Sequence, residues 1–418
     1  MFEYYRKRNI RFLEFIIPQK KKILFVDLHK ADLNIINKLR KKYPTLKVIN
    51  TKDVYGLRGK FDYVILYTSS SYVNNKKLFF RQLQKRCHPS TRIVMYQRSH
   101  IWQWIGCFIE RLRSREKKEL HNMSPTNNIS ADLISNGFEP TRIFRSTLLP
   151  FFAFGLGPII NAVATAIPFF DIFKIDRYIV ARPMPELFRK TELPQSLTIC
   201  ITVRNERDNI EPIVKSLPII CKSQEILFVE GHSSDGTREE IERIARKYTR
   251  KHVRVIGQTG RGQGDAIHVG FKESDPRDVH YFYEAIEKGR FEFVEGSRFL
   301  YPIISIPMPF INKLGNIFFA KIFSLFFNTH ISDVLGGIKA IRKRDYDTLY
   351  AQWGFLNLYD PFGDFELLYG SIRQGLKIGE IPMRYYARIY GKSKTRRIQH
   401  GFYLLRMLIK GFYIFRII

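Results

Sequence analysis

The chain is short of cysteine, of acidic residues and, near its start, of glycine. Only 4 of its 418 residues are cysteines and none forms a CxxC pair, which argues against a disulfide framework or a zinc site and favours a reducing compartment. Acidic residues number 39 against 69 basic ones, a net charge of +30, and no glycine precedes Gly56. Internal repeats and low-complexity runs are also missing. The 45% hydrophobic content indicates a globular protein that is long enough for two domains.

The excess of positive charge favours an anionic partner, such as acidic lipid headgroups or phosphorylated substrates. Nucleic acid is not expected, because the chain has neither zinc-finger spacing nor an RNP-like aromatic motif. The alternative is that the lysines and arginines form an ordinary solvated surface. The N-terminal stretch "MFEYYRKRNIRFLEF" lacks a long apolar core after its basic residues, so no cleaved signal peptide is expected.

Two apolar segments suggest contact with a membrane. Residues 146–170 carry no charge over a length that suits a span, but Pro150, Pro158 and Pro168 interrupt any continuous helix. We favour an in-plane or re-entrant membrane contact over a buried hairpin, and a hairpin over a true span. The C-terminal "GFYLLRMLIKGFYIFRII" could lie among lipid headgroups or pack as an ordinary terminal helix.

Prolines and charges around residues 181–196 indicate a linker, placed at 183–195, between a domain at 1–182 and a domain at 196–418. Short apolar runs alternate with amphipathic segments on both sides of it. The runs that we predict as strands are 22–28, 46–50, 61–67, 91–96, 197–203, 225–231 and 252–257. This alternation predicts an α/β fold with two Rossmann-like parallel-sheet domains.

Three polar loops follow successive predicted strands of the second domain. They are "VRNERDN" (203–209), "VEGHSSDGT" (229–237) and "GQTGRGQGDA" (257–266). Loops at the carboxyl ends of parallel strands commonly hold ligands. An acidic residue there can accept hydrogen bonds from a base or ribose, and a glycine-rich turn that opens a helix can approach phosphates. Each loop alone is a weak signal, because turns need Gly, Asn and Asp anyway.

In this order the loops resemble the family 2 glycosyltransferases with the GT-A fold, in the manner of dolichyl-phosphate mannose synthase. The resemblance continues through "VEGSR" (294–298), the D-x-x-x-G stretch from Asp333 to Gly337, the acidic "DPFGDFEL" (360–367) and the basic G-x-S-K segment that ends at Lys394. It covers about residues 195–405. As an ordered set, these motifs are more specific than any single glycine-rich loop.

The resemblance and the charges together imply roles for individual residues, each of which could instead be a surface charge or a cap. The nucleoside of a sugar donor would be held by Asn205, Glu206 and Glu230, with support from Asp265. Phosphate charge on donor or acceptor would be met by Arg298, Arg388 and Lys394, with Asp333 in the same group. We expect Asp364 to face the acceptor as a base or orienting group, while Glu366, two residues later, points elsewhere in a helix.

The metal motif of the resembled family is missing. Between the "GDA" and "FYEA" helices that family carries a strand ending in an Asp-x-Asp type motif, which holds a divalent metal, here Mg²⁺ or Mn²⁺, on the donor diphosphate. Here "GFKES" runs straight into "DPRDVHYFYEAI", so about fifteen residues, a strand and its loop, are absent. Asp275 and Asp278 could replace the metal pair. Pro276 after a capping Asp275 is a common helix start, however, so we assign no metal ligand.

Residues 20–115 resemble a class I S-adenosylmethionine-dependent methyltransferase, most clearly over 61–96, and residues 130–150 are similar to that fold's later helix and strand. The whole chain resembles bacterial proteins that join such a domain to a family 2 transferase. The G-x-G-x-G loop that follows the first strand in that family is absent from "KKKILFVDLHKADLN". Asp27 and Asp53 remain as ribose and adenine contacts or, in the favoured interpretation, as turn residues. We therefore expect no S-adenosylmethionine binding, and a structural or partner-binding role for this degenerate domain.

The sequence thus predicts a glycosyltransferase at the cytoplasmic face of a membrane, peripheral or monotopic. It would move a sugar from a nucleotide-sugar to a polyprenyl phosphate or another lipid-linked envelope precursor, beside an anionic membrane surface. The first alternative is a catalytically impaired pseudoenzyme that binds a nucleotide or a membrane partner. The second is an S-adenosylmethionine-dependent methyltransferase.

Overall fold

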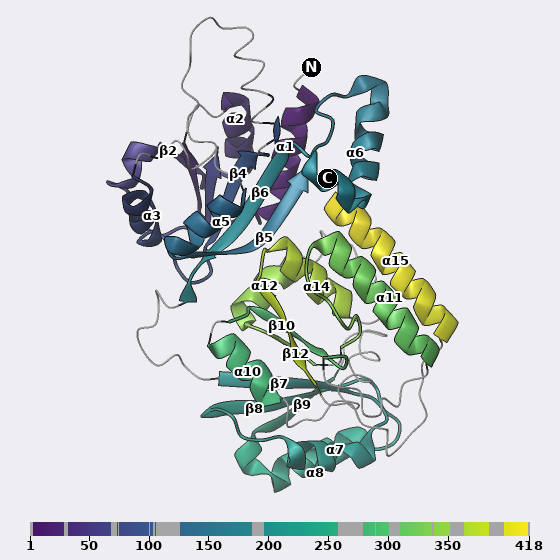
Figure 1. Cartoon of the computed structure of the whole chain (residues 1–418). Helices are drawn as coiled ribbons and strands as arrows, with labels where there is room; N and C mark the ends of the chain where they lie inside the picture. The colour runs from purple at the N-terminus through teal and green to yellow at the C-terminus, as the bar shows by residue number, and fades with distance from the viewer. Residues whose placement is uncertain are drawn as a thin grey trace, which may run out of the picture. The chain divides into compact units, whose positions relative to one another are not determined.

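The computed structural model in Figure 1 consists of two compact units. It describes residues 3–28, 32–67, 73, 75–99, 101–102, 105, 126–185, 196–257, 279–288, 290–300, 310–336, 338–351, 363–383 and 397–416. The first unit is Met1–Arg189 with Arg373–Leu376 and Phe412–Ile418, and the second is Lys190–Ile372 with Lys377–Gly411. The boundary lies inside the predicted linker. The assignment of two short later segments to the first unit was not anticipated from the sequence.

The first unit contains a six-stranded sheet of order β2-β1-β3-β4-β6-β5. Its strands are β1 (Ile23–Asp27), β2 (Lys47–Asn50), β3 (Tyr63–Tyr67), β4 (Arg92–Arg98), β5 (Phe138–Ser146) and β6 (Asp176–Pro183). The first four are parallel, while β6 runs antiparallel to both β4 and β5. The α-helices of this unit include α1 (Glu3–Ile16), α2 (Leu33–Lys42), α3 (Lys76–Gln84), α5 (Thr126–Ser135) and α6 (Leu156–Ala166). The predicted parallel α/β architecture is confirmed here.

Both faces of this sheet are buried, which explains why its strands read as continuous apolar runs. Leu24 and Val26 of β1 face one core with Phe79 and Phe80 of α3. The alternate residues of β1 face a second core to which α1 and α2 contribute. Local capping sets the helix starts. The Asp32 side chain accepts a hydrogen bond at the start of α2, and the Asn75 side chain does so at the start of α3.

The second unit holds two three-stranded sheets in its described residues. One has the order β7-β8-β9, all parallel, and the other has the order β11-β10-β12. The strands are β7 (Ser196–Val203), β8 (Ser223–Glu230), β9 (Val253–Gly257), β10 (Phe293–Ser297), β11 (Lys339–Ile341) and β12 (Ile378–Pro382). The α-helices are α7 (Arg207–Ser216), α8 (Thr237–Lys247), α10 (Val279–Glu287), α11 (Phe310–Phe327), α12 (Lys343–Tyr350), α14 (Asp364–Arg373) and α15 (Arg397–Arg416). The strands predicted at 197–203, 225–231 and 252–257 are confirmed.

The edge of β7 is the position where a fourth parallel strand would pair. In a doubly wound sheet the first strand has the second on one side and the fourth on the other. Among the described residues β7 pairs with β8 alone. Helices α7 and α8 cover one face of this sheet and bury Ile210 and Ile241 against it. The predicted missing strand would belong in residues 258–278, which lie outside the described part of the chain.

The apolar stretch of the first unit is an exposed, short helical segment. It contains a 3-10 turn at Ala153–Gly155, helix α6 and a second 3-10 turn at Pro168–Ile172. Its large apolar side chains are mostly exposed, so the segment is not a buried hairpin. Among the helices in the described ranges, none combines the length and the apolar character needed to cross a bilayer.

The sequence left two alternatives open for helix α15, a helix among lipid headgroups and a packed terminal helix, and the structure has features of both. Leu404 and Met407 are buried on one face, and the Tyr369 hydroxyl of α14 donates a hydrogen bond of 2.7 Å to the Met407 carbonyl oxygen. The opposite face exposes Phe402 and Ile409 to solvent. Up to Gly411 the helix therefore packs on the second unit with one face and leaves an apolar face uncovered by described residues.

Candidate functional site

The loops after β7 and β8 are joined by hydrogen bonds into one layer at the carboxyl edge of their sheet. The backbone N–H of Asn205 donates to Ser233 Oγ at 2.9 Å, and its side-chain oxygen accepts from the Ser234 N–H at 2.9 Å. The Glu206 N–H donates to Thr237 Oγ1 at 2.8 Å. Asn205 adopts a left-handed backbone conformation with φ of 56°. A non-glycine residue in this region is strained, and such strain is concentrated at ligand-binding turns.

Glu230 ends β8 and lies at this edge with only 6% of its surface exposed. The Ser233 N–H donates to its Oε1 at 2.5 Å. Burial by itself would raise the pKa of Glu230, but hydrogen bonds from Ser233 and from the backbone at His232 outweigh it and lower the pKa. Glu230 is therefore an ionised carboxylate at neutral pH. An ionised carboxylate at a strand end can accept hydrogen bonds from a ribose or from a base N–H.

Two further predicted donor-site residues have different outcomes. Glu206 is 6% exposed, and its Oε2 accepts a hydrogen bond of 2.7 Å from Asn209 in the first turn of α7. The structure therefore brings Asn205 and Glu206 to the same loop layer as Glu230. Asp265 lies outside the described residues, as do Asp275 and Asp278 of the shortened segment.

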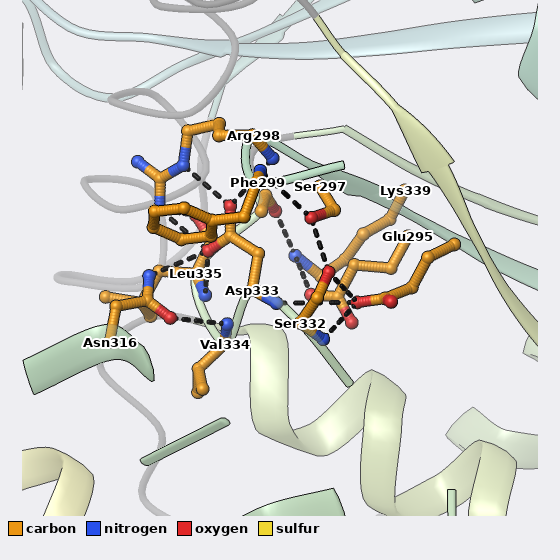
Figure 2. Close-up of polar contacts among 12 residues, drawn as sticks. Glu295, Ser297, Arg298, Phe299, Asn316, Ser332, Asp333, Val334, Leu335 and Lys339 are labelled. Atoms are coloured by element: carbon orange, nitrogen blue, oxygen red, sulfur yellow. Dashed lines mark hydrogen bonds and ion pairs between the residues drawn. The ribbon is translucent and has the colours of Figure 1, made fainter. Parts of the chain in front are cut away.

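A second group of charged residues lies around β10, where Figure 2 shows Arg298 over Asp333. The Arg298 Nε donates to Asp333 Oδ2 at 2.7 Å and one Nη donates to Oδ1 at 2.8 Å, a bidentate pair. Asn316 of α11 also donates to Asp333 Oδ1 at 2.8 Å. Asp333 is fully buried. Burial opposes its ionisation, but the Arg298 guanidinium and these hydrogen bonds prevail and lower its pKa.

A close backbone approach positions this pair. A Cβ added to Gly336 would lie 1.9 Å from the Gly296 carbonyl oxygen of β10, so only glycine fits in the turn after Asp333. The Gly296 N–H donates to the Ile338 carbonyl at 2.8 Å. The turn is thereby held against β10, with Asp333 beside Arg298. The glycine of the predicted D-x-x-x-G stretch, Gly337, lies outside the described residues.

Lys339 of β11 links two buried carboxylates that come from different elements. Its Nζ lies 2.8 Å from Asp364 Oδ1 at the start of α14 and 3.3 Å from Glu295 Oε1 of β10. It also donates to the Gly336 carbonyl at 2.5 Å. Three contacts match the three N–H donors of an ammonium group, so this lysine is fully coordinated by protein oxygens. Asp364 therefore lies in a buried ion pair that the sequence analysis did not predict.

Because the carboxylates of Glu295 and Asp364 lie close together around Lys339, one of them is protonated and the other is ionised. Burial raises the pKa of Glu295 to about 8, Lys339 opposes the rise, and the charge of Asp364 adds to it. The two carboxylates together raise the pKa of Lys339 against its own burial. The shorter contact belongs to Asp364. We assign the negative charge to Asp364 and a proton to Glu295 at neutral pH.

The remaining predicted residues are placed as follows. Glu366 is 2% exposed in the first turn of α14, and Arg388 and Lys394 lie outside the described residues. Glu295 and Lys339 were not predicted. The sequence feature that could have pointed to them is a single charged residue in each of two short strands, "FVEGS" and "KAI".

A divalent metal implied by the resembled family finds no donor set in the described residues. They contain no group of three or more His, Cys, Asp or Glu side chains that could hold an ion. The carboxylates nearest the loop layer are already engaged: Glu230 accepts from Ser233, and Asp235 accepts from the Arg207 N–H at 3.2 Å.

In the first unit, the two acidic residues considered for a cofactor have unequal outcomes. Asp53 accepts a hydrogen bond of 3.2 Å from the Asn50 N–H in a capping box, as its interpretation as a turn residue predicts. Asp27 ends β1, paired in register with Asn50. At the same carboxyl edge the rings of Tyr67 and Tyr96 stack with their centroids 4.6 Å apart. Aromatic packing thus lies where β3 ends beside Tyr96 of β4.

Comparisons with known proteins agree with the resemblance in the second unit. Residues 198–282 match the model of the glycosyl transferase family 2. Among solved structures, glucosyl-3-phosphoglycerate synthase from Mycobacterium tuberculosis with uridine diphosphate is 13% identical over 52% of this chain and 80% of that chain, with a TM-score of 0.36. The complex of that protein with Mn²⁺, uridine diphosphate and glucosyl-3-phosphoglycerate is 14% identical over 53% of this chain and 80% of that chain, with a TM-score of 0.35.

A third solved structure matches at a lower level. A putative S-adenosylmethionine-dependent methyltransferase from Listeria monocytogenes is 9% identical over 43% of this chain and 98% of that chain, with a TM-score of 0.28. TM-scores of this size do not establish a common fold. The assignment therefore rests on the family model and on the parallel sheet that carries the Glu230 loop layer. The match to the glycosyl transferase family 2 model thus covers residues 198–282, within the second α/β unit of the chain.

Proposed function

We propose that the second unit transfers a sugar from a nucleotide-sugar to an acceptor that bears a phosphate. The observation that carries this proposal is the loop layer at the carboxyl edge of β7 and β8, which lies within the family 2 segment and presents the ionised Glu230. Ligands bind at this edge of parallel sheets. In this arrangement Glu230 accepts hydrogen bonds from the nucleoside, and Asn205 holds the two loops together around it.

The buried charge group around β10 would serve orientation and acceptor chemistry. Asp333 holds the Arg298 guanidinium in one orientation through its bidentate contact. Lys339 holds Asp364 in its ionised form at the start of α14. In this proposal Asp364 acts as the base or orienting group toward the acceptor. Arg298, with Arg388 and Lys394, meets the phosphate charge that develops on the departing nucleotide.

We further propose that the acceptor is a polyprenyl phosphate or another lipid-linked precursor, reached from the cytoplasmic face of a membrane. The support is the net charge of +30 and the uncovered apolar faces of two helices of the second unit. Helix α11 exposes Ile311, Leu314 and Phe318, while α15 exposes Phe402 and Ile409. Apolar faces flanked by cations are typical of proteins that lie in the interfacial layer of a bilayer.

The test is transfer by the purified full chain. The protein would be incubated with a panel of radiolabelled nucleotide-sugars and polyprenyl phosphate in vesicles, with Mg²⁺, with Mn²⁺ and with chelator. The expected result is label in the lipid fraction for at least one donor, abolished or strongly reduced by Glu230→Gln. The matched control is Glu225→Gln, which changes an acidic residue of the same strand that pairs with Arg254 at 2.7 Å away from the loops. Absence of transfer across the whole panel would contradict the proposal that the chain is an active glycosyltransferase.

A second candidate function is a catalytically impaired protein that binds a nucleotide or a membrane partner without turnover. The observation that favours it is the sequence itself, in which "GFKES" is followed directly by "DPRD" where the resembled family carries its metal motif. Calorimetric titration with nucleotide diphosphate separates the two candidates. Binding that divalent metal strengthens supports the enzyme, and binding that metal leaves unchanged supports the impaired protein.

A further inference from the structure

The exposed apolar segment of the first unit, Phe151 to Phe173, has the opposite pattern to an ordinary surface helix. Along α6 the residues at i, i+3, i+4 and i+7 are Leu156, Ile159, Ile160 and Val163, and their exposed fractions are 58%, 60%, 40% and 54%. This spacing is the apolar stripe that normally faces a core. Here it faces outward, while the small residues Gly157 and Ala164 face inward.

The segment is held in this exposed arrangement by specific contacts. The buried Asn161 side chain accepts from the N–H groups of Leu148 and Leu149 at 2.6 and 2.9 Å, and donates to the Leu149 carbonyl at 2.8 Å. At the base of the segment, Asp171 pairs with Arg145 at 3.3 Å. The exposed apolar surface is therefore a built feature of the fold and not a frayed end.

The tip of the segment has a strained backbone and a fully exposed ring. Phe154 has a φ of 53° and an exposed fraction of 104%, and the neighbouring Ala153 has a φ of 45°. Left-handed conformations of non-glycine residues cost free energy and persist where a function requires them. A fully exposed aromatic ring gives no packing energy in return. Both features suit a surface that an apolar partner covers.

Beside this surface lies a pocket of about 860 Å³ between α1 and the apolar segment. One wall is apolar, from Phe151, Phe152 and Pro158, and the other carries Lys7, Arg8 and Arg11 with one carboxylate, Glu3. Lys7 pairs with Glu3 at 2.8 Å, whereas Arg11 makes no ion pair with any described residue. The volume is that of a site for a small organic ligand.

Arg8 is a third cation on the same wall of the pocket. It is 8% exposed, it lines the pocket, and its Nε has no hydrogen-bond partner among the described residues. A buried guanidinium donor without an acceptor is costly, and such groups are normally paired. The positive charge of Arg8 adds to those of Lys7 and Arg11 on the same wall of the pocket, which favours an anionic ligand there.

We propose that this pocket binds the phosphate of an anionic phospholipid, with the Phe151–Phe173 segment inserted into the apolar boundary of the same membrane. The cations of α1 contact the headgroup, and the stripe of α6 with Phe154 contacts the acyl chains. This combination of an apolar face and adjoining cations is what an interfacial anchor requires. The anchor belongs to the first unit and does not depend on sugar transfer by the second.

The test is cosedimentation of the full chain with vesicles of phosphatidylcholine, with and without phosphatidylglycerol. The expected result is stronger binding to the anionic vesicles. The double variant Phe154→Ser/Ile159→Ser should weaken binding roughly tenfold or more, since two apolar side chains lose their burial. The matched control is Leu33→Ser/Ile134→Ser, which changes two apolar residues that are exposed by 71% and 51% elsewhere in the first unit. Equal binding by the two variants would overturn the proposal.

A charge pair of variants tests the pocket separately. Lys7→Gln/Arg11→Gln should weaken the binding to anionic vesicles by roughly tenfold or more, because each removed charge contributes a factor of about ten or less. The binding of this variant to neutral vesicles should stay the same. Arg58→Gln/Lys60→Gln removes the same charge at exposed positions away from the pocket and should keep the binding. The proposal is wrong if inorganic phosphate at constant ionic strength competes fully, which would indicate a soluble anion. It is also wrong if Phe154→Ser/Ile159→Ser converts a dimer to a monomer, which would indicate a second copy as the partner.

Discussion

Two glutamates on strands of the second unit are buried to a similar degree, and their pKa values shift in opposite directions. Glu230 ends β8 with 6% exposure, and Glu295 lies within β10 with 3% exposure. The pKa of Glu230 is lowered because hydrogen bonds from the following turn outweigh its burial. The pKa of Glu295 is raised to about 8, since burial dominates and its neighbouring lysine is shared with Asp364. The degree of burial therefore does not decide the charge of a carboxylate, but the number of donors that face it does.

The difference also separates the functions of the two regions. The loop layer around Glu230 presents an ionised acceptor at an edge of the sheet where ligands bind. In the group around Glu295 the charges neutralise one another in the protein interior, because Arg298 pairs with Asp333 and Lys339 pairs with Asp364. We interpret the first region as recognition and the second as the support that fixes the orientation of Arg298 and Asp364.

The largest effect is expected from removing one partner of the interior pair. Asp333→Ala leaves the Arg298 guanidinium buried without its carboxylate, and breaking such a pair typically costs about 3–5 kcal/mol of unfolding free energy. Urea denaturation of the full chain measures this change. The double variant Arg298→Met/Asp333→Leu should recover much of the loss. If the double variant is no more stable than the single one, the charge pairing is not the cause.

The next effect concerns the pH dependence of stability through Glu295. Its folded pKa is raised above the unfolded value, so its stabilising protonated state is fully present at low pH and is lost as the pH rises through about 8. Glu295→Gln should remove a decline of a few kcal/mol in the free energy of unfolding between about pH 5 and pH 8. Thermal or urea midpoints across this range provide the measurement. An unchanged slope in the variant would show that Glu295 is not the titrating group.

The comparison predicts a different result for Glu230. Replacing an ionised acceptor by a neutral amide in Glu230→Gln should weaken binding of a nucleotide diphosphate by roughly 10- to 100-fold, as expected for hydrogen bonds to a charged group. The unfolding midpoint should change little in comparison with Asp333→Ala. Isothermal titration measures the affinity, with Glu225→Gln as the control. If the two variants bind the nucleotide diphosphate with equal affinity, Glu230 does not contact the nucleotide.

The smallest effect is expected where charges are paired but exposed. Glu211 on α7 is contacted by Arg243 at 2.7 Å and by Lys247 at 2.7 Å, and these contacts lower its pKa. Solvent screens such a surface cluster, so Glu211→Gln should shift the unfolding midpoint least of the four variants. Moderate salt should remove the remaining difference. A destabilisation as large as that of Asp333→Ala would contradict the distinction between buried and exposed pairs.

Much of the secondary structure could be predicted from the sequence because apolar runs and turn residues specify it locally. The strands at 22–28, 197–203 and 225–231 were predicted within a few residues of the observed β1, β7 and β8. The carboxyl-edge loops were also predicted, since each directly follows a strand. The pairing of Lys339 with Glu295 and Asp364 could not be, because these residues are up to 69 positions apart and meet only through the packing of three elements.

By itself, the sequence determined the element order, the alternating α/β architecture and the family 2 motif set of this protein, since each follows from short-range patterns of apolar, glycine and acidic residues. The tertiary structure alone decided which charges neutralise one another. Gly336 must approach the Gly296 carbonyl before Asp333 can lie beside Arg298. It also decided that the stripe of α6 faces outward. An apolar stripe has the same sequence pattern whether it is buried in a core or exposed, and only the packing of the opposite face through Asn161 distinguishes the two cases.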